Sequence, residues 1–342
     1  MATGLHRDVL HPHALAGLPP ARAASCPVGI SKAGAPVWSS SEPRIPTERA
    51  VRRGEVECGT NDHQTLQDLP VARRQFNARR VYTALVFAPL FYLLVRYFPA
   101  TVFFALVVSA ALLALVEFYR LHFREERAPI AMALGLVSGG LLLTGMQWPG
   151  LLPERMVLLL MLIAVLTYPL FSRRELGRSL VDSAVLVFGV LYIGITLGHL
   201  LLTRALEGGE FLIFFLFLVT WAGDTGAYYA GRGLGRRQLA PVISPNKTVE
   251  GVLGGLILAV AAALVARAWF LPSFSVTDCV AIGLLLTLAG ALGDLTESVL
   301  KRSAGVKDSG TVIPAHGGML DRLDSLLFAA PAFYYYVTLV KT

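Results

Sequence analysis

A short stretch near the C-terminal end of the chain gathers acidic and basic side chains between two apolar runs. Residues 293–325 read GDLTESVLKRSAGVKDSGTVIPAHGGMLDRLDS, and the runs at 280–292 and 326–340 flank them. Charged residues make up only 15% of the chain. Charged side chains next to membrane-length segments cost free energy, and where they are kept they commonly mark a functional site. We therefore expect residues 293–325 to hold the working site.

The polar side chains of this stretch fall on two helix faces. One face carries four of them at the spacing i, i+3, i+4 and i+7: Asp294, Glu297, Ser298 and Lys301. Asp321 and Asp324 share a face of the following helix. Carboxylates that face a common cavity suit Mg²⁺, a hard cation that prefers carboxylates and substrate phosphates. The alternative is a set of ion pairs at helix ends, Glu297 with Lys301 or Asp321 with Arg322.

The segment between these helices has features of a phosphate site. Gly317 and Gly318 would let backbone amides approach an anion just before a helix N-terminus. Lys301 and Arg322 would suit phosphate oxygens, the lysine as a point charge and the arginine through its fork. His316 is open to two interpretations, a base or an ordinary loop histidine.

A second polar cluster runs from residue 223 to residue 251. Asp224 lies inside an apolar run, where an acid is a functional candidate, although a helix-packing contact would also explain it. Residues 244–248 read SPNKT and predict a loop that leads into a helix, with Asn246 and Lys247 free to hold a phosphate or a base. Thr248 could equally cap that helix. Three arginines, 232, 236 and 237, could bind lipid headgroups or only fix the topology.

The elements that must position these side chains are membrane helices. The chain has 342 residues, is 55% hydrophobic and has a mean hydropathy of +0.60, and its apolar runs are long enough to span ~30 Å of hydrocarbon. We predict an all-α polytopic membrane protein with about nine transmembrane helices. Their expected ranges are 81–98, 99–119, 129–147, 156–172, 180–203, 211–230, 249–271, 276–293 and 325–340.

The basic residues of the loops predict the orientation. Alternate loops are rich in arginine and lysine, from Arg73 and Arg74 near the start to Lys301 and Lys307 near the end, whereas the intervening loops carry few. The positive-inside rule therefore puts the N-terminus and the polar clusters in the cytoplasm. Residues 1–74 lack apolar periodicity and predict a disordered or weakly ordered extension before a membrane domain at 75–342. Organellar targeting by residues 1–41 is the less favoured interpretation of that extension.

These features together indicate metal-assisted phosphoryl or nucleotidyl chemistry at the cytoplasmic membrane face. Residues 298–324, SVLKRSAGVKDSGTVIPAHGGMLDRLD, resemble the full signature of the phosphatidate cytidylyltransferases, or CDP-diacylglycerol synthases. DTGAYYAGRGLGR at 224–236 and SPNKTVEG at 244–251 are also similar to this family. The resemblance covers residues 75–342 and says nothing of residues 1–74.

The resemblance implies the reaction CTP + phosphatidate → CDP-diacylglycerol + pyrophosphate in a Mg²⁺-dependent enzyme of a bacterial-type inner membrane. It implies Asp294 and Asp321 as metal carboxylates supported by Asp324, with room for a second cation. Together with these three, Ser298 and Lys301 complete the expected catalytic set. The expected substrate-binding residues are Asp224, Ser244, Asn246, Lys247, Arg302, Lys307, His316, Gly317, Gly318 and Arg322.

Two other functions compete with this prediction. A CTP-dependent lipid kinase, such as a polyprenol kinase, would use the same ligands but release CDP. An ion-coupled transporter could also place Asp224 and Asp294 in the membrane, although paired repeats with interrupted helices would then be expected. The expected partners are CTP and phosphatidate in the bilayer, not nucleic acid, and a homodimer is compatible with the sequence.

Overall fold

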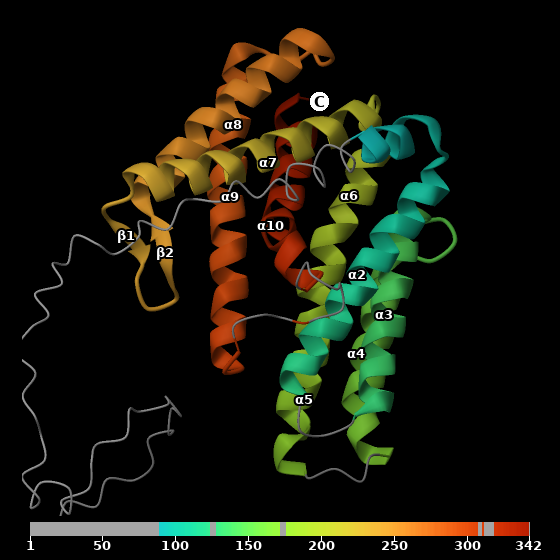
Figure 1. The fold of residues 1–342 in the computed structure, drawn as a ribbon. Coiled ribbons are helices and arrows are strands. Elements are labelled where there is room, and N and C mark those ends of the chain that lie inside the picture. Colours follow the sequence, from blue (N-terminus) through green and yellow to red (C-terminus); the bar gives the residue numbers. More distant parts are fainter. Residues whose placement is uncertain (1–88, 124–127, 172–175, 307–309, 311–317, 342) are drawn as a thin grey trace, which may run out of the picture. The chain divides into compact units, whose positions relative to one another are not determined.

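The computed structural model describes residues 89–123, 128–171, 176–306, 310 and 318–341. The N-terminal extension expected at residues 1–74 lies outside the described residues. Within them the fold is almost entirely helical, as predicted (Figure 1). Residues 89–97 are helical and belong to the first expected span, 81–98, of which residues 81–88 are not described.

The described helices follow the predicted order of apolar runs. The first group is α2 (Ala100–His122), α3 (Pro129–Gln147), α4 (Glu154–Phe171), α5 (Leu176–Gly189), η2 (Val190–Ile195) and α6 (Thr196–Ala205). The second group is α7 (Gly209–Leu234), α8 (Val249–Trp269), α9 (Val276–Ser303), α10 (Leu320–Tyr336) and η3 (Val337–Lys341). Eight described helical stretches are long and apolar enough to cross a membrane, with α5, η2 and α6 forming one of them and α10 with η3 another.

Proline and a wide helical turn shape the first group. Pro99 is the N-cap of α2 and has an extended backbone, φ −61° and ψ 155°, so the chain turns within residues 98–99 as predicted. The span expected at 180–203 contains a π-helical segment, η2, that the apolar pattern did not predict. Such segments interrupt α-helices locally and are frequent at functional sites.

Helices α7 and α8 lie against each other along much of their length (Figure 1). Glycines allow this close approach: a Cβ at Gly226 would lie 2.6 Å from the carbonyl oxygen of Gly254, and one at Gly255 would lie 2.8 Å from that of Gly223. Gly254 and Gly255 therefore serve helix packing, in line with small residues at membrane-helix contacts.

A small hairpin joins these two helices where the sequence predicted a loop. Strands β1 (Gln238–Ala240) and β2 (Ser244–Thr248) pair antiparallel, with Gln238 opposite Thr248. Thr248 then caps α8, because its Oγ1 accepts a hydrogen bond from the N–H of Gly251 at 3.1 Å. The capping role left open for Thr248 is present, and the strand holds Lys247 and its neighbours in a fixed register.

Helix α10 packs against α9, α6, α7 and α2, so its first turn is surrounded by several elements (Figure 1). The contact with α9 is especially tight at one point. A Cβ at Gly293 would lie 2.3 Å from the backbone oxygen of Asp324. The two helices that carry the predicted carboxylates therefore touch backbone to backbone beside those carboxylates.

Candidate functional site

A cavity of about 420 Å³ lies among α7, β2, α8, α9 and α10. Its polar lining includes three carboxylates and a lysine from four different elements: Asp224, Lys247, Asp294 and Asp324. Its apolar lining includes Val219 and Leu286, which precede Asp224 and Asp294 by 5 and 8 residues on their helices. At 1.5 Å per residue those residues lie roughly 7 and 12 Å along their helices from the two aspartates. Thr220 and Thr287 line the same part of the cavity, which is therefore uncharged but not wholly apolar.

Lys247 connects the hairpin to helix α9. Its Nζ lies 2.7 Å from Oδ2 of Asp294 and donates a hydrogen bond of 3.3 Å to the carbonyl oxygen of Ala291. The other oxygen of Asp294, Oδ1, accepts a hydrogen bond of 3.4 Å from Ser298 one turn later. Asp294 and Ser298 therefore lie on the same side of α9, as predicted. Lys247, from a distant part of the chain, contacts that side of the helix.

The next carboxylates meet around Ser325 on α10. The Ser325 backbone N–H donates to Oδ1 of Asp324 at 2.6 Å. Its hydroxyl lies 3.3 Å from the same oxygen and 3.4 Å from Oδ1 of Asp224 on α7. Asp224, the acid inside an apolar run, thus lines the same cavity as Asp324 of α10.

Lys301 bridges α9 and α10. Its Nζ lies 2.5 Å from Oε2 of Glu297, one turn earlier on α9, and 2.6 Å from Oδ1 of Asp321 on α10. The Glu297–Lys301 ion pair considered as an alternative is therefore present. Asp321 pairs with Lys301 across the helix contact, and this pair fixes the start of α10 beside the last turns of α9.

Three carboxylates lie close enough to bind one cation. One oxygen from each of Asp294, Glu297 and Asp324 lies within 4.8 Å of the other two. The prediction had named Asp321 as a ligand beside Asp294 and Asp324, whereas Glu297 is the residue that lies in the group with these two. Glu297 and Asp321 both also pair with Lys301. Spacing alone could have suggested Glu297, because it lies three residues after Asp294 on the same face.

This donor set fits a divalent cation. All three candidate ligands offer carboxylate oxygen, which Mg²⁺ prefers. Among the described residues at and beside the cavity, five carboxylates, Asp224, Asp294, Glu297, Asp321 and Asp324, stand against the two ammonium groups of Lys247 and Lys301. Uncompensated negative charge is costly at membrane depth, so a bound cation would reduce the repulsion among these groups.

The start of α10 is held by carboxylates. The N–H groups of Met319 and Leu320 donate to the two oxygens of Glu117 on α2, and the N–H of Gly318 donates to Oδ2 of Asp321 at 3.3 Å. The amide of Gly318 was predicted to approach a phosphate. In this structure a phosphate would have to displace Asp321 from that amide.

The other predicted binding residues fall into three groups. Ser244 and Asn246 line the cavity beside Lys247. Arg302 lies near the end of α9 and Arg322 near the start of α10, and both are exposed. Neither lines the cavity, so their predicted contact with phosphate stays a prediction. Lys307, His316 and Gly317 lie outside the described residues.

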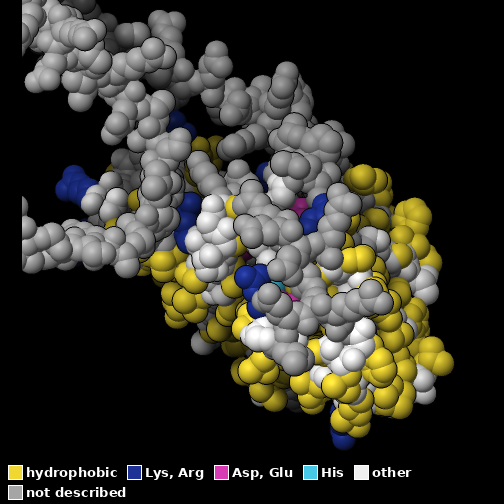
Figure 2. Space-filling model, turned by 90° about the horizontal axis from the view of Figure 1, so that it is seen from below, with side chains coloured by type: hydrophobic (Ala, Val, Ile, Leu, Met, Phe, Trp, Pro, Cys, Tyr) yellow, Lys and Arg dark blue, Asp and Glu magenta, His cyan; other side chains and the backbone are white. Residues whose placement is uncertain are grey.

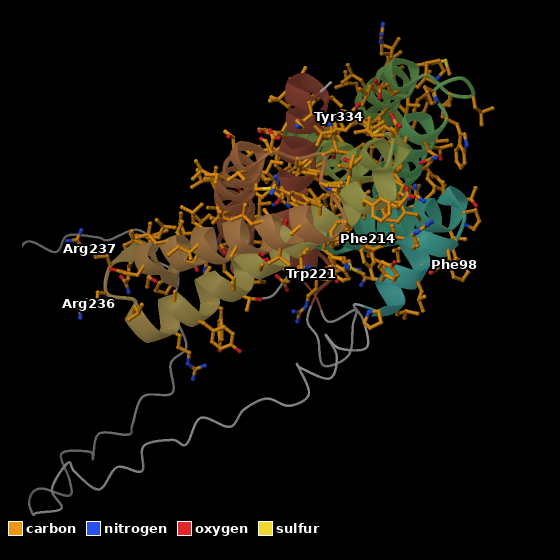
Figure 3. The ribbon with its side chains drawn as sticks, turned by 90° about the horizontal axis from the view of Figure 1, so that it is seen from above. Phe98, Phe214, Trp221, Arg236, Arg237 and Tyr334 are labelled. Atoms are coloured by element: carbon orange, nitrogen blue, oxygen red, sulfur yellow. The ribbon has the colours of Figure 1, made fainter. Side chains whose placement is uncertain are left out.

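The hairpin arginines lie apart from the cavity carboxylates. Arg236 and Arg237 lie at the far end of the α7–α8 pair with their side chains directed outward (Figure 3). Their backbone N–H groups donate to the carboxylate of Glu250 at 3.0 and 3.1 Å. Arg232 donates to the hydroxyl of Tyr228 at 2.7 Å. The backbone contacts of Arg236 and Arg237 therefore stabilise the hairpin, and their side chains face outward.

The described surface is rich in apolar side chains. Seen from below, hydrophobic side chains cover much of it, and a few acidic and basic side chains lie among them (Figure 2). Because the long helices are apolar over lengths that span a membrane, the protein is an integral membrane protein.

Comparison with known proteins agrees with this architecture. Residues 78–340 match the cytidylyltransferase family. The chain belongs to this family. A phosphatidate cytidylyltransferase of Staphylococcus saprophyticus is 43% identical over 174 residues, and proteins of the same name from Staphylococcus epidermidis and Staphylococcus aureus are 41% and 42% identical over 174 and 175 residues. Each match covers 51% of this chain and 65% of the relative, so the chain spans just under two thirds of the length of these relatives.

Proposed function

We propose that this protein transfers a cytidylyl group from CTP to phosphatidate, which gives CDP-diacylglycerol and pyrophosphate. The observation that carries the proposal is the cavity among membrane-length helices in which Asp224, Asp294, Asp324 and Lys247 meet. Such a site can receive a nucleotide from water and a phospholipid from the bilayer. The family and the names of the three relatives support this choice of substrates.

The reaction needs charge screening more than a strong base. An oxygen of the phosphatidate phosphate would form a bond to the α-phosphorus of CTP, and the bond from that phosphorus to the β-phosphate oxygen would break, so that pyrophosphate leaves with the electron pair. The attacking oxygen is already anionic, so no proton has to be removed from it. Two anions must be brought together, which makes positioning and electrostatic stabilisation the main tasks.

The side chains of the cavity can perform these tasks. Asp294, Glu297 and Asp324 would hold Mg²⁺, which would screen the triphosphate and stabilise the leaving pyrophosphate. Lys247, now 2.7 Å from Asp294, would turn to a phosphate oxygen when the nucleotide enters. Lys301 keeps Asp321 and Glu297 in place across the two helices. The apolar lining around Val219 and Leu286 suits the less polar part of a ligand.

The orientation and the assembly belong to the proposal as well. We place the N-terminus and the cavity mouth on the cytoplasmic side, because basic residues are concentrated in alternate loops of the sequence. A bacterial-type plasma membrane fits the bacterial relatives. A second bound cation and a homodimer are compatible with the site, and nucleic acid is not an expected partner.

Two labels on CTP test the reaction against its nearest alternative. The purified full-length protein is given Mg²⁺, either phosphatidate or a polyprenol as the lipid acceptor, and CTP that carries a label in either the α- or the γ-phosphate. Cytidylyl transfer puts the α-label in the lipid and the γ-label in pyrophosphate. A lipid kinase would put the γ-label in the lipid and release labelled CDP from the α-labelled substrate, and that result would replace the proposed reaction.

A further inference from the structure

Glu117 on α2 makes a buried contact with the helix that carries Asp321 and Asp324. Its side chain is 1% exposed. Oε1 accepts a hydrogen bond of 2.9 Å from the N–H of Met319, and Oε2 accepts one of 2.8 Å from the N–H of Leu320. These partners are far apart in the sequence, since Met319 comes 202 positions after Glu117.

These two bonds meet a need of the α10 N-terminus. The first N–H groups of a helix have no acceptor within the helix, and the N-cap residue Met319 makes no side-chain capping bond of its own in the described structure. Glu117 supplies both acceptors from another helix. A carboxylate is favoured there because the helix N-terminus carries partial positive charge.

The same carboxylate also faces a residue that precedes α10. A Cβ at Gly310 would lie 3.0 Å from Oε1 of Glu117 and 3.1 Å from its Cδ. Any larger residue at position 310 would therefore press on the carboxylate that caps α10. Glu117 thus lies between Gly310 and the first residue of α10.

The position of this cap matters because the first turn of α10 belongs to the candidate site. Asp321 follows Leu320 directly and pairs with Lys301 at 2.6 Å. Asp324 lies one turn farther on, within the group of carboxylates formed with Asp294 and Glu297. A shift or rotation of the start of α10 would therefore move both aspartates relative to α9.

We propose that Glu117 is a positioning residue for cytidylyl transfer, which fixes the start of α10 so that Asp321 and Asp324 face α9 in the active geometry. This inference rests on the proposed function, because it assigns a role in that reaction. Glu117 is not among the residues that line the cavity. It acts through the backbone of Met319 and Leu320, and it links the first half of the membrane domain to the carboxylates of the second half.

The test compares Glu117→Gln with a matched variant in the first turn of α9, far from the candidate site. The glutamine keeps the size of the side chain but offers one oxygen and one NH₂ group to two N–H donors. Asp278→Asn is the control, because Asp278 is also buried and accepts hydrogen bonds from the Ser275 N–H at 2.7 Å and the Tyr336 hydroxyl at 2.9 Å. Asp278 caps the start of α9 and is far along that helix from Asp294.

Each variant is purified full length in lipid nanodiscs, and its unfolding midpoint, kcat, KM for CTP and half-saturating Mg²⁺ concentration are measured. We expect Glu117→Gln to lower kcat roughly 10- to 100-fold, since a ~1 Å misplacement can cost ~100-fold, and to raise the Mg²⁺ requirement. Asp278→Asn should lower the unfolding midpoint at least as much while kcat stays near the wild-type value. Equal kcat losses in the two variants at equal loss of stability would overturn the proposal, as would an unchanged kcat in Glu117→Gln.

A second variant reaches the same contact while Glu117 is retained. Gly310→Ala should lower kcat and raise the Mg²⁺ requirement in the same way as Glu117→Gln but less, because the carboxylate has to give way by only a few tenths of an ångström. If Gly310→Ala and Glu117→Gln both keep the wild-type kcat, the positioning role is refuted.

Hydrogen–deuterium exchange separates this inference from the proposed function. If Glu117 holds the start of α10, the amides of residues 319 and 320 exchange faster in Glu117→Gln than in the wild type, whatever reaction the protein catalyses. Unchanged exchange there would sink the inference even if CDP-diacylglycerol is formed. Absence of CDP-diacylglycerol in the wild type with faster exchange in the variant would instead refute the proposed function alone.

Discussion

Replacement of Gly293 by alanine tests whether the close contact of α9 and α10 sets the geometry of the site. The new Cβ would lie 2.3 Å from the backbone oxygen of Asp324, whereas such contacts are essentially never shorter than 3.0 Å. The helices would therefore have to separate by about 0.7 Å or more, right between Asp294 and Asp324. Overpacking of this kind costs ~1–3 kcal/mol of folding stability.

The expected effect on activity is larger than the effect on stability. Because a ~1 Å misplacement of reacting groups can cost ~100-fold in rate, we expect kcat for CDP-diacylglycerol formation to fall roughly 10- to 100-fold. The assay measures kcat with saturating CTP and Mg²⁺, together with the unfolding midpoint. Gly140→Ala on α3 is the control, since nothing lies within 4 Å of its added Cβ, and it should keep wild-type kcat. A Gly293→Ala protein with wild-type kcat would refute the idea that this contact positions the carboxylates.

Three further substitutions address the cavity. Asp324→Asn should remove nearly all activity while the protein still folds, because it deletes a candidate cation ligand; retained turnover with Mg²⁺ would exclude that ligand. Lys247→Met should raise KM for CTP by roughly 10- to 100-fold, the equivalent of a charged hydrogen bond of ~1.5–3 kcal/mol, with a smaller change in kcat, and an unchanged KM would contradict the assigned role. Glu297→Gln should weaken Mn²⁺ binding more than Asp321→Asn does, as measured by electron paramagnetic resonance. A larger loss in Asp321→Asn would restore Asp321 as the third ligand.

Much of the fold could be predicted because membrane helices have a strong sequence pattern. The apolar runs predicted the described helices closely, and 129–147 coincides with α3. The turn at Pro99 followed from the restriction that proline imposes on its neighbour. Helix α9 extends ten residues beyond its expected end at 293, because polar residues on one face do not end a helix that packs on that face.

The helical spacing of Asp294, Ser298 and Lys301 also predicted which side chains share a face. What spacing could not give is the pairing between distant elements. Lys247 meets Asp294 only because the β1–β2 hairpin returns the chain to α9. Asp321 was expected at the cation, yet its contact with Lys301 depends on the rotation of α10 against α9.

Glu117 shows the same limit most clearly. Its position in VEFYRL, near the end of an apolar run, indicates only a residue that caps or pairs there. It does cap a helix, but that helix is α10, and the first acceptor contact spans 202 residues. Local pattern carries no information about which distant N–H groups a buried carboxylate will meet, so its connection to the candidate site required the structure.

The most direct test of the account is the formation of CDP-diacylglycerol by the purified full-length protein. Wild type and Asp324→Asn are incubated with CTP and phosphatidate, with Mg²⁺ or with excess chelator, and the lipid products are identified by mass spectrometry. The account predicts CDP-diacylglycerol and an equal amount of pyrophosphate from the wild type with Mg²⁺, and almost none in the other three conditions. A well-folded wild-type protein that forms no CDP-diacylglycerol with Mg²⁺ would contradict the central claim.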